Sequence, residues 1–460
     1  SGGFAVDNSC RFNDGSSDSL NRTFGTPSNN KIHTTSVWFK RSSGLGVNQS
    51  ITYVPQGGGY ARILLHNTDK IIIDGQDSSA SNEYTLTTNR LFRDTSAWYH
   101  LVYAFDDTQS TASDRFKLYI NGVQETSFTS VTYPVQNLDY PYNSANPHYI
   151  GSNSAGATYF DGYLAEYCFI DGTQNAVTDF GEFDEDSGIW KPINVSGLTF
   201  GTNGFYLDFE NSGSLGADVS GNGNNFTVNN LTAVDQSTDT CTNNGTTFQP
   251  LNVPTSNAPT FSEGNLKTVT NGSDGNFGGT STIGVSQGKW YAEFKFISTS
   301  GGMQVGITGD PSEDARLNNY TGENSLGYSV FSGNGNKFNN GSQSSFGVTW
   351  GANDIIGVAL DLDNHKIYFH KNGTYMNSGD PTSGATGTGS AFNLTTGYDY
   401  FFSVSDGSSG DSSTIDANFG SPPYAISSGN TDSNGYGNFE YAVPSGYLSL
   451  CTANLSEVLG

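Results

Sequence analysis

Two short stretches of the sequence share a pattern that strongly limits how the chain can fold. RFKLYINGVQ, residues 115–124, and KIYFHKNGTY, residues 366–375, each lead through alternating side chains into an Asn-Gly pair. Asn and Gly both tolerate the positive φ angles of a type I′ turn, so the pair predicts a tight β-hairpin. A strand of similar sequence precedes each hairpin, LVYAFDD in the first and VALDLDN in the second. We therefore expect a three-stranded meander in each half of the chain.

The rest of the sequence favours strands and turns in the same way. Its 460 residues include 58 Gly, 25 Tyr and 30 Phe, and 14% of them are charged. Aromatic residues fit a pleated surface, whereas Gly, Asn and Ser form turns. No long segment has a helical period. Residues 98–108 predict a strand with two faces, Trp98, His100, Val102, Ala104 and Asp106 on one, and Tyr99, Leu101, Tyr103 and Phe105 on the other.

This pattern predicts an all-β protein with two sandwiches. We expect a first sandwich over residues 1–234 and a second over residues 262–424. Residues 235–261 have the Ser/Thr/Asn/Pro composition of a linker, and residues 425–460 read as a short C-terminal tail.

Charge and motifs argue against several classes of function. The net charge is −25, from 44 acidic and 19 basic residues, and no cluster of Lys and Arg occurs. Nucleic-acid binding is therefore not expected. No apolar run approaches the ~20 residues of a membrane-spanning helix. The sequence has no GxSxG elbow, Walker loop or HExxH motif, so nucleophilic and zinc-dependent catalysis are unsupported.

The best candidate for acid–base chemistry is GEFDEDSG, residues 181–188. In an extended strand, alternation would place three carboxylates on one face: Glu182, Asp184 and Asp186. A retaining glycosidase needs two carboxylates ~5–5.5 Å apart. The stretch is short and bounded by Gly, so the sequence favours an acidic surface loop.

A second acidic segment resembles a calcium-binding loop. DVSGNGNN offers oxygen ligands at alternate positions, with Gly223 placed as in an EF-hand: Asp218, Ser220, Asn222 and Asn224. The twelfth position holds Asn229 rather than an acid. A plain Gly/Asn turn is the favoured interpretation, and a calcium site is the alternative. No other cofactor is expected.

Longer stretches resemble two known families. SVWFKRS, AWYHLVYAFD, YIGSNS and YFDGYLAEYCFIDGT resemble a laminin-G/pentraxin-type domain of the concanavalin A-like lectin/glucanase superfamily. GKWYAEFKF, VGITGD, DIIGVALDLDNHKIYFHKNG and DANFGSPPY resemble a SPRY domain. Both families share a jelly roll, so the resemblance implies two tandem jelly-roll β-sandwiches plus the short tail.

This pairing is similar to structural proteins of tailed phages, marine ones especially. The resemblance implies a non-enzymatic virion surface protein, a tail fibre or capsid decoration, that either binds host or environmental glycans or decorates the particle. It also implies other virion proteins as partners, and a homo-oligomer. A glycan hydrolase of the same superfamily and a secreted cellular adhesin are the alternatives.

In SPRY domains, loops at one edge of the sandwich form the ligand surface. The matching loop here spans residues 309–325 and offers aromatic and amide side chains suited to sugars: Arg316, Asn318, Asn319 and Tyr320. An ordinary polar loop is the alternative.

The resemblance also bears on the four cysteines. It places the first strand of the lectin-like domain beside a late strand, and these strands contain Cys10 and Cys168. Cys241 and Cys451 flank the second domain. We expect the disulfides Cys10–Cys168 and Cys241–Cys451, with buried free thiols as the alternative.

Overall fold

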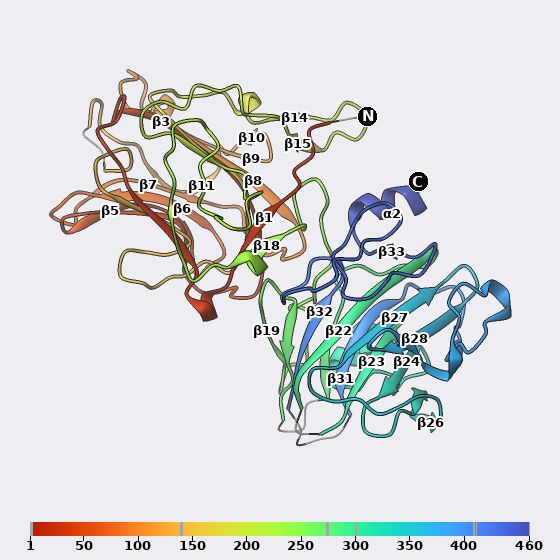
Figure 1. Cartoon of the computed structure of the whole chain (residues 1–460). Coiled ribbons are helices and arrows are strands. Elements are labelled where there is room, and N and C mark those ends of the chain that lie inside the picture. The colour runs from red at the N-terminus through yellow and green to blue at the C-terminus, as the bar shows by residue number, and fades with distance from the viewer. Residues whose placement is uncertain are drawn as a thin grey trace. The chain divides into compact units, whose positions relative to one another are not determined.

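The computed structural model describes residues 3–138, 141–272, 276–299, 301–407, 410 and 412–459. The chain forms two compact units, Ser1–Thr242 and Asn243–Gly460, and each is built mainly of β-strands (Figure 1). Among the described residues, no helix has the length and apolar character needed to cross a membrane.

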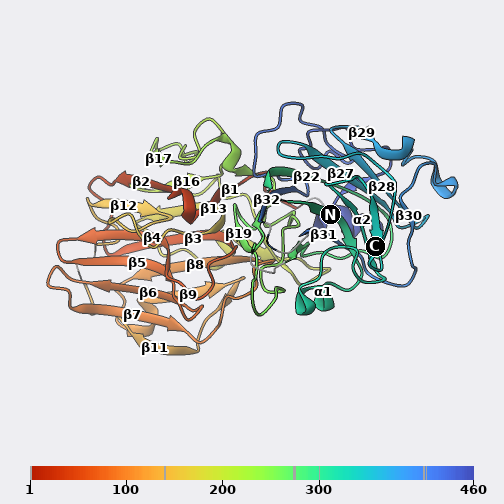
Figure 2. The same cartoon turned by 90° about the horizontal axis from the view of Figure 1, so that it is seen from below.

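The first unit is a sandwich of two eight-stranded antiparallel sheets. Its inner sheet has the order β10 (Val123–Gln124), β9 (Phe116–Ile120), β8 (Trp98–Asp106), β3 (Ile32–Arg41), β13 (Gly162–Asp171), β1 (Ser9–Phe12) and β18 (Gln236–Ser237), with β16 (Phe205–Leu207) beside β13. Its outer sheet has the order β11 (Phe128–Thr132), β7 (Asn82–Thr88), β6 (Ile71–Gln76), β5 (Gly59–Leu65), β4 (Gln49–Gln56), β12 (Pro147–Ile150), β2 (Ser19–Thr23) and β17 (Thr227–Asn229) (Figure 2).

The core of the first unit lies between these sheets. Leu101, Tyr103 and Phe105 of β8 point into it, and Val102 joins a second apolar cluster on the other face of the inner sheet. The two predicted faces of β8 are confirmed. The face that includes Val102 is also largely buried, because residues 172–200, which include β14 (Gly181–Phe183) and β15 (Trp190–Pro192), pack against the side of the inner sheet that faces away from the core.

The second unit is also a two-sheet sandwich. One sheet has the order β19 (Thr260–Ser262), β20 (Lys267–Val269), β32 (Ser413–Asn418), β22 (Lys289–Thr299), β27 (Ile355–Asp361), β28 (Lys366–Lys371) and β29 (Thr374–Tyr375), with β30 (Phe392–Asn393) beside β28 and β33 (Leu448–Ser449) beside β22. The other has the order β21 (Phe277–Thr280), β31 (Phe401–Asp406), β23 (Met303–Thr308), β24 (Gly327–Phe331), β25 (Lys337–Asn339) and β26 (Ser342–Ser344).

Both Asn-Gly hairpins form as predicted. The φ angles are 49° at Asn121 and 78° at Gly122, and 49° at Asn372 and 82° at Gly373. Two consecutive positive φ angles are the signature of a type I′ turn. Each Asn side chain also accepts a hydrogen bond from the preceding strand of the meander, since Oδ1 lies 2.7 Å from the backbone nitrogen of His100 in one unit and 2.8 Å from that of Ile355 in the other.

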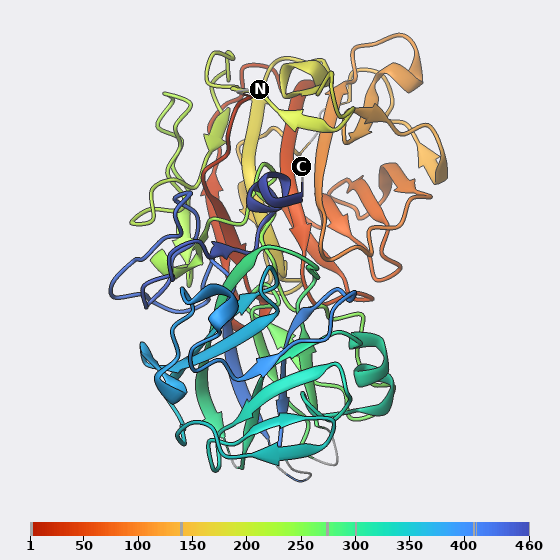
Figure 3. The same ribbon diagram turned by 90° about the vertical axis from the view of Figure 1, so that its right-hand side faces the viewer.

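The C-terminal residues belong to the second sandwich. The short strand β33 pairs in parallel with β22, and the segment ends in α2 (Thr452–Leu459), dark blue in Figure 3. Phe439 and Tyr447 are buried against the outer side of the sheet. The carboxylate of Glu293 on β22 accepts hydrogen bonds from the backbone nitrogens of Glu440 and Tyr441, at 2.9 and 2.8 Å. The described part of the predicted tail, residues 425–459, therefore covers an apolar sheet face.

All four cysteines are free thiols in this structure, so the two predicted disulfides are not formed. Strands β1 and β13 are neighbours as expected, but Cys10 lies opposite Leu164 rather than Cys168. Cys10 faces the sandwich core, whereas Cys168 belongs to the cluster on the other side of the sheet. Cys241 lies in the first unit and Cys451 in the second. Burial raises the thiol pKa of each of the four.

Candidate functional site

The outward face of the outer sheet in the first unit carries a row of aromatic and polar side chains. In β4, β5 and β6 the core positions are apolar, and Ile63 and Ile73 are fully buried. Side chains alternate across a strand, so Tyr53, Arg62 and Asp74 face away from the core. The sequence patterns did not predict a site on this face.

Strand register brings these side chains into line. Cα pairing joins Tyr149 to Tyr53, Tyr53 to Arg62, and Arg62 to Asp74. The same line continues through strands at both sides, to Asn21 and Thr227 in one direction and to Thr85 and Thr132 in the other. We call Tyr149, Tyr53, Arg62 and Asp74 the transverse row. Strands lie about 4.8 Å apart, so the line from Asn21 to Thr85 is about 24 Å long.

Ionic and aromatic contacts hold the middle of the row rigid. Arg62 donates from Nε and Nη2 to the two oxygens of Asp74, at 2.8 and 3.0 Å. The Tyr60 hydroxyl donates to Asp74 at 3.2 Å, and the guanidinium of Arg62 lies 4.4 Å from the centre of the Tyr60 ring. The rings of Tyr53 and Tyr60 stack with centroids 5.7 Å apart. Burial and the nearby Asp74 raise the pKa of Tyr60 to about 12, so its hydroxyl stays a neutral donor.

This arrangement can bind a flat, hydroxylated ligand. Tyr149, Tyr53 and Tyr60 are partly exposed, and each has an apolar ring face with a polar tip. The guanidinium and carboxylate of Arg62 and Asp74 neutralise one another and supply fixed donors and acceptors. Aromatic faces combined with a few oriented polar groups are typical of small-ligand and sugar sites.

The residues predicted in the loop 309–325 lie together, but two of them support the loop. Residues 311–317 form the helix α1 (Pro311–Leu317). Asn318 Oδ1 accepts hydrogen bonds from the backbone nitrogens of Asn276 and Phe277, and the side-chain amide of Asn319 donates to Asp314. Of the predicted four, Arg316 is exposed beside Glu313 at 3.7 Å, and Tyr320 is partly exposed with its ring against that of Phe338.

The same loop also covers the outward face of its sheet. Thr321 bonds through its hydroxyl to Ser403 and through its backbone nitrogen to Ser405, each at 2.8 Å. Its carbonyl accepts from the Ser329 hydroxyl at 2.6 Å. The second sheet of the second unit is therefore covered at Ser403 and Ser405, whereas the outer sheet of the first unit carries a partly exposed row.

The calcium-like segment forms a hydrogen-bonded turn. The carboxylate of Asp218 accepts from the backbone nitrogens of Tyr206, Ser220 and Asn224, at 2.9, 2.9 and 2.7 Å. The side-chain nitrogens of Asn222 and Asn224 donate to carbonyls of residues 201–204. No group of three or more His, Cys, Asp or Glu side chains placed to hold a metal ion occurs in the part of the chain that the structure describes.

The acidic segment 181–188 is a turn at the protein surface. Strand β14 ends at Phe183, so Glu182, Asp184 and Asp186 do not share one strand face, and the acidic surface loop that the sequence favours is confirmed. A hydrogen bond from Lys191, followed by those from Ser187, holds the pKa of Asp184 below its usual value.

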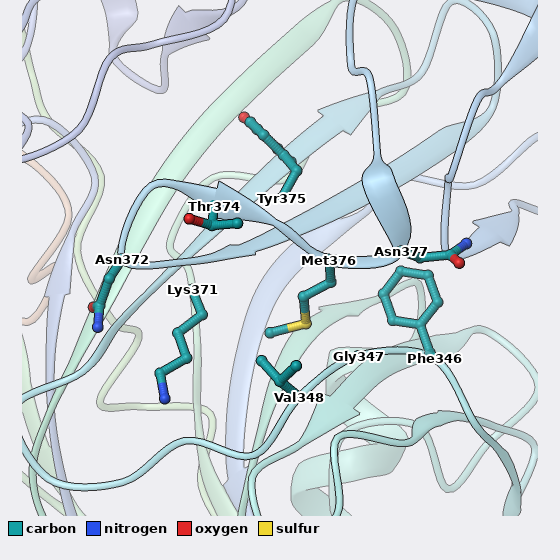
Figure 4. A pocket seen from close by; sticks show the side chains of 9 residues that line it. All are labelled: Phe346, Gly347, Val348, Lys371, Asn372, Thr374, Tyr375, Met376 and Asn377. Carbon is teal, nitrogen blue, oxygen red and sulfur yellow. The ribbon is translucent and has the colours of Figure 1, made fainter.

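A small pocket of about 350 Å³ opens on the second unit between residues 346–348 and 371–377 (Figure 4). Phe346, Val348 and Met376 give it an apolar side. Its one basic side chain, Lys371, already contacts Asp354 at 3.1 Å and the Thr349 carbonyl at 3.0 Å. Because the Lys371 ammonium is held by these two contacts, the pocket offers a ligand mainly apolar contacts.

Two protein-family models match separate parts of the chain. The family model described as concanavalin A-like lectin/glucanases superfamily matches residues 14–176, and the SPRY domain model matches residues 289–405. No curated protein matches the chain. Among solved structures, the SPRY domain of human HERC1 is 22% identical with a TM-score of 0.29, over 37% of this chain and 96% of that one. The stonustoxin structure is 18% identical with a TM-score of 0.28, over 38% of this chain and 27% of that one. The chain thus joins a concanavalin A-like domain to a SPRY domain.

Proposed function

We propose that this is a non-enzymatic carbohydrate-binding protein, and that its first unit holds a glycan along the transverse row. The observation that carries the proposal is the alignment of the partly exposed Tyr149, Tyr53 and Arg62 with the buried carboxylate of Asp74 on one sheet face. The match of residues 14–176 to the concanavalin A-like lectin/glucanases superfamily supports a carbohydrate as the ligand.

The shape and charge of the row narrow the ligand. The line of side chains from Asn21 to Thr85, about 24 Å long, suits an extended polymer better than a single sugar. Arg62 is paired with Asp74, so the row carries no net charge where the ligand would lie. Together with a chain charge of −25, this favours an uncharged polysaccharide. The carboxylate of Asp74 is engaged by Arg62 and Tyr60, which suits binding rather than proton transfer.

We also propose that the protein is displayed on a virion surface, as a phage tail fibre or a capsid decoration, and acts as a homo-oligomer with other virion proteins as partners. The resemblance of the paired domains to virion proteins supports this part. Antibody labelling of native particles from the source sample tests it. Label at tail tips or over capsids would support display, and particles free of label would favour a secreted adhesin.

Binding itself is tested by replacing the rings of the row. We expect the double variant Tyr53→Ala, Tyr149→Ala to lose about tenfold or more in affinity for an uncharged β-glucan such as laminarin, about 1.4 kcal/mol. Tyr398→Ala is the matched control, because Tyr398 is 43% exposed on the other unit. Calorimetric titration of each full-length variant gives the affinity.

The same titration is repeated with a panel of polysaccharides, because the row does not specify which sugar the polymer contains. If uncharged polysaccharides bind and the double variant binds them as tightly as the unmodified protein, the row is not the site. If none of the panel binds, the proposed function itself fails. Release of reducing sugar from the panel would instead support a hydrolase.

A further inference from the structure

One margin of the outer sheet in the first unit ends in an open strand. Strand β11 lies at this margin and pairs on one side with β7 (Figure 2). Its sequence is FTSVT, and four of its five residues are exposed. Val131 is 40% exposed and nearby Val135 is 62% exposed. An edge strand of this kind presents unpaired backbone groups that another strand can bind.

The other sheet margins in the described residues are better protected. The end strands β10, β18, β17, β19, β29 and β26 have two or three residues each, and the four residues of β21 are buried. Natural proteins protect edges with short strands, charges or Pro. Strand β11 is longer than each of these, and residues 126–136 contain no charged side chain in a chain of net charge −25. A bulge interrupts the pairing between Phe128 and Ser130, so residues 130–132 form its regular part.

We propose that β11 pairs antiparallel with β11 of a second copy of this chain, so that two outer sheets join into one continuous sheet. The distribution of charge along this margin favours a second copy of the chain as the partner. Lys70 lies at one end of this margin, where its Nζ donates to Thr129 Oγ1 at 2.6 Å. Glu83 and Asp77 lie toward the other end, and burial followed by the charge of Asp77 raises the pKa of Glu83.

A two-fold axis perpendicular to the sheet reverses one copy relative to the other. It therefore sets the basic end of each margin against the acidic end of the other, while both outward faces stay on the same side. Lys70 and Glu83 are both on the outward face, because their neighbours Ile71 and Tyr84 point into the core. Parallel pairing would set like charges together, which disfavours it.

This inference deepens the homo-oligomer part of the proposed function. Joined sheets would place two transverse rows on one face, and a polymer that reaches both would gain avidity without any new contact. The oligomeric state is measured without ligand, so a failure here is distinguishable from a failure of glycan binding.

Sedimentation equilibrium of the full-length chain over a range of concentrations tests the pairing. We expect a reversible dimer of twice 49.0 kDa. Ser130→Lys places two ammonium groups against one another near the axis, at an exposed position, and we expect it to weaken the dimer about tenfold or more. Ser344→Lys adds the same charge to the exposed edge strand β26 and should leave the dimer unchanged.

A charge exchange gives the second test. Lys70→Glu and Glu83→Lys should each weaken the dimer, and the double variant should restore it. Circular dichroism of each variant confirms that it is folded. A single species of 49.0 kDa at every concentration, or a dimer that Ser130→Lys leaves intact, would overturn the proposal.

Discussion

At the scale of single residues, Glu166 is placed where a carboxylate is costly to ionise. It lies in strand β13 at a bulge between Ala165 and Cys168, with a φ angle of 49°. Its side chain is buried, and the Tyr206 hydroxyl donates a hydrogen bond to it at 2.6 Å. Burial raises the pKa of Glu166 to about 7, against an ordinary value near 4.5.

The raised pKa of Glu166 predicts that the stability of the protein depends on pH. Between about pH 4.5 and pH 7 the folded protein holds a proton that the unfolded chain has lost, so stability falls as the pH rises through this window. Gln at this position does not ionise, so it causes no such loss of stability as the pH rises. We expect Glu166→Gln to match the unmodified protein near pH 4.5 and to be more stable by up to about 3 kcal/mol near pH 8.

Urea denaturation at several pH values measures this difference. Glu185→Gln, at an exposed position in the turn after β14, controls for the loss of one charge. A difference between Glu166→Gln and the unmodified protein that stays constant with pH would show that Glu166 is ionised in the folded state throughout.

The residues of the transverse row show why the candidate site could not be predicted from the sequence. Alternation within ITYVPQ, GYARILL and IIIDGQ already indicates which side chains point outward. Which of them lie side by side depends on the register of strands far apart in the sequence, as for Tyr149 and Tyr53. Composition drew attention instead to amide-rich loops, where Asn318 and Asn319 turned out to hold the loop together.

At the scale of elements, local signals predicted the hairpins well because the turn chemistry lies within a few residues. In each unit one sheet has its face away from the core covered by other segments: the inner sheet of the first unit and the sheet that contains β22 in the second. The sequence did not predict which segments cover these faces. Trp190 packs there in the first unit and Phe439 in the second. Both come from segments with weak strand patterns, so their packing follows from contacts distant in sequence. The disulfide expectation failed for a related reason, since neighbouring strands can carry cysteines on opposite faces.

The first hairpin gives a prediction about such packing. A Cβ atom at Gly122 would lie 2.3 Å from the ring of Trp190, and the φ angle of Gly122 is also unfavourable for Ala. We expect Gly122→Ala to lower the free energy of unfolding by about 2–4 kcal/mol, because backbone strain and overpacking add.

Gly221→Ala separates these two causes. Gly221 belongs to the same unit and has a φ angle of 91°, but no atom lies within 4 Å of its added Cβ. We expect a cost of about 1 kcal/mol there from backbone strain alone. Urea denaturation monitored by fluorescence compares the two. Equal costs would mean that the turn accommodates Ala without disturbing Trp190.

At the scale of the whole molecule, charge decides which polymers can approach. The net charge is −25, and the basic member of the transverse row is already paired. An anionic polysaccharide should therefore be repelled at low salt, where the Debye length is about 30 Å at 0.01 M, and less so at high salt. Binding of an uncharged β-glucan through stacking and hydrogen bonds should change little with salt.

One substitution should make the net charge of the transverse row positive. Asp74→Asn leaves the guanidinium of Arg62 without its carboxylate and gives the row a net positive charge, while Asn can still accept from Tyr60. We expect this variant to gain affinity for alginate about tenfold at low salt and to lose that gain at about 0.5 M salt, where screening is strong. Equilibrium titrations with laminarin and alginate at both salt concentrations measure the effect. Tight, salt-sensitive binding of alginate by the unmodified protein would contradict the argument, because it would require a basic surface elsewhere that dominates the charge of the chain.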